Sequence, residues 1–101
     1  MFVRNVSINM KPNSVTEFSK ILESQIIPML RKQPGFRDEI AYVNENANHI
    51  TMISIWESKE QADAFQAAGY AEALKSVASL IDGTPKVRTS SVIHSTLLVT
   101  A

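Results

Sequence analysis

The sequence predicts an α+β fold whose elements follow in the order strand, helix, strand, strand, helix, strand. Two junctions carry this prediction. At the first, residues 26–36 close an amphipathic helix, turn at Pro34-Gly35 and begin a strand. At the second, residues 53–58 end a strand in a tryptophan and cap a new helix immediately afterwards. Because crossover connections are right-handed, this order places the first and third strands at the centre of the sheet.

The first half of the chain is predicted to form a strand and a helix. Residues 2–10 alternate between apolar and polar side chains, as a strand does. The pattern from Ser14 to Glu17 is typical of a capping box, and an apolar helical stripe follows it. Pro28 removes a backbone donor inside this stripe, so we expect it to kink or divide the helix. One face of the first strand is predicted to hold Val6, Ile8 and Met10, and the other face Asn5, Ser7 and Asn9.

Two further strands are predicted over residues 36–45 and 49–56. The later one carries apolar side chains on both faces, whereas one layer of helices covers only one face of a sheet. We therefore expect the uncovered face to pack against the sheet of a second copy, in a homodimer. On the earlier strand, one face is predicted to hold Phe36, Asp38, Ile40 and Tyr42, and the other Ala41 and Val43.

The last third of the chain completes the fold. A second capping-box pattern starts at Ser58, and the helix it begins is predicted to break at Gly69-Tyr70 and to end at residues 82–85. Residues 87–99 are predicted to form a final extended segment, and the tail at 96–101 is apolar enough that we expect it to pair with the partner subunit. With both helices on one side of the sheet, the arrangement is a ferredoxin-like βαββαβ sandwich.

Composition excludes several classes of protein. From their number we expect the 101 residues to form one domain, residues 1–101. Ten basic and ten acidic residues cancel without clustering, which argues against nucleic acid as a partner. The absence of cysteine excludes disulfides and thiolate-bound metals. No apolar run reaches the ~20 residues of a membrane span, and no signal-peptide pattern is present, so we expect a cytoplasmic protein with no membrane partner.

Three stretches resemble the antibiotic biosynthesis monooxygenase family. They are the turn at Lys11-Pro12, the junction at residues 28–36 and the junction at residues 54–62, within a likeness that spans roughly residues 2–95. The resemblance implies a dimeric α+β barrel with a pocket between each sheet and its own helices. It also implies a monooxygenase that oxidises a quinol- or anthrone-like aromatic with O₂ and needs no cofactor.

The resemblance implies Asn5 and Trp56 as catalytic residues that project into one pocket. The Asn5 amide is suited to stabilise a substrate oxyanion, and the Trp56 indole to hold an aromatic ring or donate its N–H. Polar side chains on a strand also bind local backbone or water, and tryptophan is also a common core residue. The residues expected to contact substrate are Ser7, Asn9, Tyr42, Phe65 and Tyr70.

Departures from the family pattern leave alternatives open. Met52 and Ala62 stand where cofactor-free oxygenases of the family have an asparagine and a tyrosine. This favours a second hypothesis, a non-catalytic small-molecule-binding or stress-related dimer, beside a third in which the interior is simply filled. Phe65 and Lys75 replace the tryptophan and the histidine of the haem-degrading branch, which argues against haem.

Charged and metal-ligating residues give weaker signals. Arg4 and Arg88 are candidates to attract an anion at one edge of the sheet, although arginines on edge strands are commonly solvated or paired with acids. His94 lies in a strand pattern and has a pKa suited to a general base. His49 and His94 are far apart and lack nearby carboxylates, so no metal site is predicted.

Overall fold

The computed structural model describes residues 1–44 and 48–96. It contains a four-stranded antiparallel sheet with the strand order β2-β3-β1-β4. The first and third strands are central, as the right-handed connections predict, and the ferredoxin-like fold is confirmed. The strands are β1 (Phe2–Met10), β2 (Phe36–Asn44), β3 (His49–Trp56) and β4 (Ile81–Ser91).

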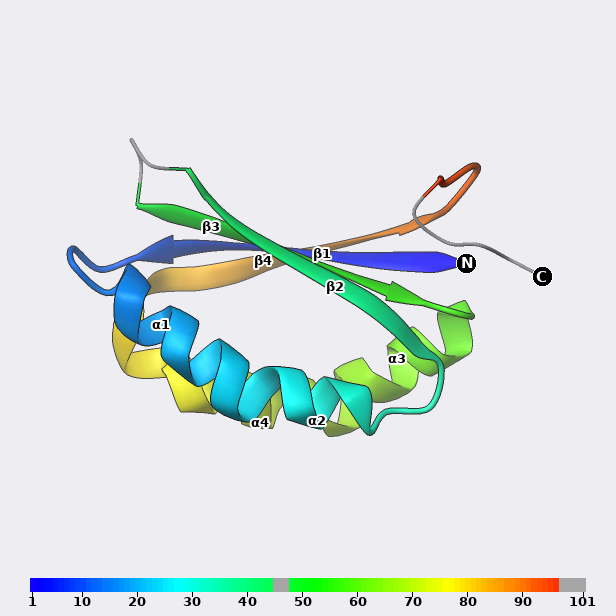
Figure 1. Cartoon of the computed structure of the whole chain (residues 1–101), viewed down its shortest axis with the longest axis horizontal. Helices are drawn as coiled ribbons and strands as arrows, with labels where there is room; N and C mark the ends of the chain where they lie inside the picture. The colour runs from blue at the N-terminus through cyan, green and yellow to red at the C-terminus, as the bar shows by residue number, and fades with distance from the viewer. Residues whose placement is uncertain (45–47, 97–101) are drawn as a thin grey trace.

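All of the helices lie on one side of the sheet (Figure 1). The first helical region is divided into three segments and the second into three, with breaks at Leu22, Ile27, Gly69 and Ala78. The segments are α1 (Val15–Ile21), the π-helical η1 (Leu22–Ile26), α2 (Ile27–Arg31), α3 (Lys59–Ala68), α4 (Tyr70–Val77) and the 3₁₀-helical η2 (Ala78–Leu80). No helix among residues 1–44 and 48–96 is long and apolar enough to cross a membrane.

The predicted effect of Pro28 on the first helix is confirmed. Pro28 lies in the first turn of α2, directly after the π-helical segment from Leu22 to Ile26. A π turn bonds i to i+5 and is wider than an α turn. It therefore tolerates the missing N–H of proline and leaves room for the ring, which would otherwise crowd the preceding turn. The segment keeps Leu22 and Ile26 buried, so the irregular turn still faces the core.

The two predicted capping boxes differ in outcome. Ser58 is extended (φ −144°, ψ 160°), and its Oγ accepts a hydrogen bond from the Gln61 backbone N–H at 3.3 Å, as predicted. The prediction of a capping box at Ser14 is wrong. Ser14 has φ −102° and ψ −8°, which is not the extended backbone typical of an N-cap, and its side chain makes no capping bond.

A β-bulge in β2 changes which face Phe36 occupies. Phe36 pairs with Trp56 and Asp38 with Ile55, so Arg37 is an extra residue between the two pairs. Phe36 therefore faces the helices, and its predicted place on one face with Asp38, Ile40 and Tyr42 is wrong. The helix side of β2 is made by Phe36, Glu39, Ala41 and Val43.

Strand β4 begins earlier than predicted. It starts at Ile81, and its register against β1 shifts where Gly83 has a positive φ of 80°. Residues 82–85 thus belong to an irregular strand start and not to a turn after the helix. Regular pairing ends at Ser91. Apart from Thr96, the tail predicted to pair with a partner lies outside the described residues.

The core lies between the helix-facing side of the sheet and the helices. Trp56 and Phe18 are its largest fully buried side chains. On the opposite side of the sheet, Ile40 and Tyr42 are 40% and 53% exposed in the single chain. We call that side the open face. The buried side of β1 consists of Phe2, Arg4, Val6, Ile8 and Met10, an apolar row except for its arginine.

Candidate active site

A row of three polar side chains crosses the helix-facing side of the sheet. Arg4 on β1 pairs with Ser54 on β3, and Ser54 pairs with Glu39 on β2. Directly paired residues in antiparallel strands point to the same face. Because neighbouring strands lie about 4.8 Å apart, the Cα atoms of Arg4 and Glu39 are about 10 Å apart. We call Arg4, Ser54 and Glu39 the polar row.

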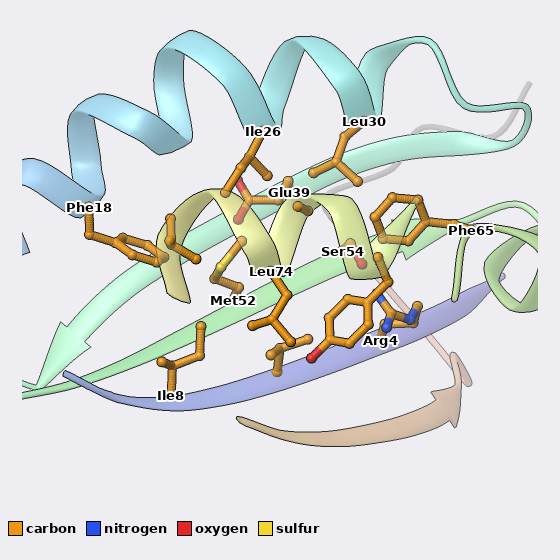
Figure 2. Close-up of a pocket in the computed structure, with 14 residues that line it drawn as sticks. Arg4, Ile8, Phe18, Ile26, Leu30, Glu39, Met52, Ser54, Phe65 and Leu74 are labelled. Atoms are coloured by element: carbon orange, nitrogen blue, oxygen red, sulfur yellow. The ribbon is translucent and has the colours of Figure 1, made fainter. Parts of the chain in front are cut away.

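The polar row lines a cavity between the sheet and the helices. The cavity contains about 530 Å³ of space free of atoms, part of it continuous with solvent. Figure 2 shows Arg4 toward the end near Phe65, with Phe18 and Ile8 toward the other end. Its remaining walls are almost wholly apolar, so the polar row supplies most of the site's polar chemistry. The lining residues are Arg4, Val6, Ile8, Phe18, Ile26, Leu30, Glu39, Met52, Ser54, Phe65, Tyr70, Ala73, Leu74 and Val77.

Arg4 is buried and only partly satisfied. It is 2% exposed, and its guanidinium carbon lies 5.2 Å and 4.8 Å from the ring centroids of Phe65 and Tyr70. Its Nη2 donates a hydrogen bond to Gln66 Oε1, whereas its buried Nε has no acceptor among the described residues. Burial lowers the pKa of Arg4, partly offset by attraction to Tyr70 and Asp63. Arginine nevertheless remains charged in proteins.

Glu39 holds its proton unusually tightly. Burial, with a smaller contribution from the neighbouring Asp38 charge, raises the pKa of Glu39 to about 7. The side chain is half-buried, and its Oε1 is buried without a hydrogen-bond partner in the described part of the chain. In Figure 2 it lies between the sheet and the helix that carries Ile26 and Leu30. A carboxyl group that titrates near neutrality is suited to accept and return protons.

Trp56 packs behind the cavity and does not line it. It is fully buried, stacks on Phe65 at 5.3 Å between centroids and meets Phe36 edge-on at 5.6 Å. Its Nε1–H donates to Ser54 Oγ at 2.9 Å. The indole donor is therefore already used within the core, where it fixes the orientation of the middle member of the polar row.

Asn5 lies on the other side of the sheet from Trp56. Asn5 pairs with Ile53, whereas Trp56 pairs with Phe2, and residues one position apart along a strand point to opposite faces. The expectation that Asn5 and Trp56 share one pocket is therefore wrong for a single chain. Asn5 lines a shallow groove on the open face, together with Ser7, Tyr42, His49, Thr51, Lys86, Arg88 and Ser90.

The residues predicted to contact substrate are divided between the two faces. Phe65 and Tyr70 line the cavity beside Arg4, whereas Ser7 and Tyr42 line the groove on the open face. Asn9 is exposed and lines neither. Burial raises the pKa of Tyr70, although the Arg4 charge opposes this. The binding roles stay predictions.

The polar row does not follow from the sequence prediction. The expectation that Arg4 lies at an edge of the sheet is wrong, because β1 is central and Arg4 points inward. The sequence does indicate the inward position of Arg4, because the alternation places it on the same strand face as the apolar Val6 and Ile8. No group of three or more His, Cys, Asp or Glu side chains in the described ranges is placed to hold a metal ion.

The chain is similar to one family of known proteins and to solved structures that share its fold. The profile of the family Antibiotic biosynthesis monooxygenase matches residues 1–77. The structure is similar to the NE2512 protein of unknown function from Nitrosomonas europaea, at 16% identity and a TM-score of 0.80, over 98% of this chain and 95% of that one. No functionally curated protein sequence matches the chain.

Two similar structures are oxygenases. One is a monooxygenase from the ActVA-Orf6 gene of Streptomyces coelicolor, in complex with nanaomycin D; it has 18% identity and a TM-score of 0.79 over 99% of this chain and 92% of that one. The other is a mutant form of SnoaB, a cofactor-independent oxygenase from Streptomyces nogalater, with 14% identity and a TM-score of 0.74 over 94% and 96%. At these identities the likeness shows the shared fold.

Proposed function

Because this chain belongs to the antibiotic biosynthesis monooxygenase family, we propose that it oxidises a quinol- or anthrone-like aromatic with O₂ and without a cofactor. The observation that supports this most is the apolar cavity in which Glu39 and Arg4 both have an unpaired buried atom. The cofactor-independent activity of SnoaB adds support by analogy of fold.

The polar row suits the first step of such a reaction. The Glu39 carboxylate takes a proton from the substrate's phenol or benzylic carbon, because its pKa of about 7 leaves both protonation states populated at neutral pH. The positive charge of Arg4, at the other end of the polar row, favours an anionic substrate in the cavity, and the apolar walls keep water from the anion that forms. Tyr70 lies over the guanidinium and helps to hold it in place.

The remaining steps balance without a further reductant. For an anthrone-like substrate, whose benzylic CH₂ loses the proton, the carbanion passes electrons to O₂ and forms a carbon–oxygen bond, which gives a peroxide. Protonation of the peroxide's outer oxygen by Glu39, loss of the remaining C–H proton and cleavage of the O–O bond give a ketone and water. The net reaction is R₂CH₂ + O₂ → R₂C=O + H₂O, with one oxygen atom entering the product.

Oxygen uptake by metal-free protein over a panel of anthrones and hydroquinols tests this proposal. We expect uptake above the uncatalysed rate, and a loss of about 100-fold in Glu39→Gln, within the range of general acid–base contributions. Glu23→Gln, on the exposed side of η1, is the matched control and should retain the activity. No uptake by the wild type on any member would contradict the proposal.

The residues predicted from the sequence keep testable roles. We propose that Trp56 shapes the cavity through Phe65 and Ser54, and that Asn5 acts only if a second copy closes the open face over it. A homodimer through that face is itself a proposal, supported by the exposed Ile40 and Tyr42. The cytoplasmic location stays a prediction.

One observation favours the alternative, a non-catalytic small-molecule-binding or stress-related dimer. Met52 lines the cavity where the family's oxygenases are expected to present an amide, and the Trp56 N–H is bonded to Ser54. Neither side chain therefore offers a donor to a substrate oxyanion. Tight ligand binding without oxygen uptake would establish this alternative.

A further inference from the structure

We propose that the cavity takes an aromatic acid, a flat ring system whose carboxylate binds Arg4 and whose hydroxyl at the opposite end faces Glu39. This inference rests on the proposed function, since it names the ligand class of the same site. It is carried by the charge and by the unfilled hydrogen-bonding atoms of the polar row.

The charge of Arg4 has no bonded counter-charge among the described residues. Burying a cation in this way is strongly unfavourable. Asp63 attracts Arg4 electrostatically, but its carboxylate accepts a 2.7 Å hydrogen bond from Lys59 on the exposed side of α3. The ion pairs of the described residues join other partners, Arg37 to Glu57 and Lys59 to Asp63. A ligand anion would supply the missing charge inside the cavity.

The geometry of the guanidinium favours a carboxylate as that anion. Phe65 and Tyr70 hold its position through ring contacts, and Gln66 accepts from Nη2. The Nε–H is left without an acceptor among the described residues, although Arg4 is only 2% exposed. Carboxylates bind arginine side-on through two parallel hydrogen bonds, so an unfilled N–H on a held guanidinium suits a carboxylate better than a lone hydroxyl.

The opposite end of the row suits a hydroxyl group. Glu39 Oε1 is buried and has no donor in the described part of the chain. A ligand hydroxyl donates to the ionised carboxylate and accepts from the protonated one, so it satisfies Glu39 in either state. Between the two ends the walls are apolar, including Val6, Met52 and Leu74. The middle of the ligand must therefore be apolar, and about 10 Å between the two Cα atoms suits a ring system that carries oxygens at both ends.

Isothermal titration calorimetry with redox-stable naphthalenes tests the inference without turnover. The probes are 6-hydroxy-2-naphthoate, 2-naphthoate, 2-naphthol and 2-naphthylmethylammonium. We expect affinity to fall in that order, with the carboxylates about tenfold tighter than 2-naphthol because of the charge-assisted bonds to Arg4. The cation should bind worst, since Arg4 repels it.

Variants locate the effect. Arg4→Met keeps a long side chain but lacks the charge, and should weaken both carboxylates about tenfold while leaving 2-naphthol unchanged. Arg31→Met, on the exposed end of α2, is the matched control and should bind all four probes as the wild type does. Glu39→Gln should reduce the advantage of 6-hydroxy-2-naphthoate over 2-naphthoate. If Arg4→Met does not fold, the order of the probes on the wild type decides the question.

Two results would overturn the inference: equal affinity of 2-naphthol and 2-naphthoate for the wild type, or unchanged carboxylate affinity in a folded Arg4→Met variant. These results are separable from the proposed function. Anthrone-dependent oxygen uptake without a carboxylate preference would refute the ligand class alone. Carboxylate binding at Arg4 without any oxygen uptake would refute the oxygenase alone.

Discussion

Replacing Glu39 by glutamine should change the pH dependence of stability. The pKa of Glu39 is raised from 4.5 to about 7 in the folded protein, so the folded state holds this proton more tightly than the unfolded state. The contribution of this proton to stability is therefore fully present below pH 4.5 and is lost as pH rises to about 7 and beyond. In Glu39→Gln the side chain is neutral throughout, so this loss should disappear.

The magnitude follows from the same shift. The shift from 4.5 to about 7 corresponds to about 1.4 kcal/mol per pH unit. For a wholly enclosed carboxyl group, the free energy of unfolding would therefore fall by ~3 kcal/mol as the pH rises through this range. Because the side chain is only half-buried, solvent screening reduces this to about 1–2 kcal/mol. Between low and high pH, the free energy of unfolding of Glu39→Gln should therefore rise by about 1–2 kcal/mol relative to that of the wild type.

Urea denaturation at about pH 4.5 and about pH 8.5 measures this difference on either side of the Glu39 titration. We expect the free energy of unfolding of the wild type to fall relative to Glu39→Gln across that interval, and Glu23→Gln to follow the wild type. Parallel changes in the wild type and Glu39→Gln would refute the claim that burial holds the Glu39 proton.

Three further predictions concern packing and assembly. Trp56→Phe removes the donor to Ser54 and should lower the free energy of unfolding by about 1–3 kcal/mol while the cavity still binds ligand; unchanged stability in urea would contradict this. Gly35→Ala places a Cβ against the Gln61 side chain at a φ of +82°, and should lower stability by about 1–3 kcal/mol in the same assay. Ile40→Arg on the open face should convert a dimer into monomers in light scattering, whereas a monomeric wild type would refute the dimer.

The fold was predictable because its signals are local. The cap at Ser58, the break at Gly69 and the division of the helix by Pro28 each follow from the chemistry of one or two residues. Strand order then follows from handedness, which needs no knowledge of side-chain contacts. The extra residue Arg37 was not predictable, since a bulge depends on how β2 meets β3 and leaves no periodic trace in a short strand.

The site was less predictable because it depends on register between distant strands. Alternation shows that Asn5 and Ile8 point to opposite faces, but only the pairing of Phe2 with Trp56 shows which face the tryptophan shares. The same holds for Arg4 and Glu39, which become neighbours only through Ser54 between them.

The pH dependence of kcat/KM for oxygen uptake, in the wild type and in Glu39→Gln, tests the central claim most directly. We expect a wild-type profile that rises through about pH 7 as the Glu39 base ionises, and the loss of that rise with most of the activity in Glu39→Gln. An active Glu39→Gln variant with the wild-type profile would contradict the assignment of Glu39 as the base in the cavity.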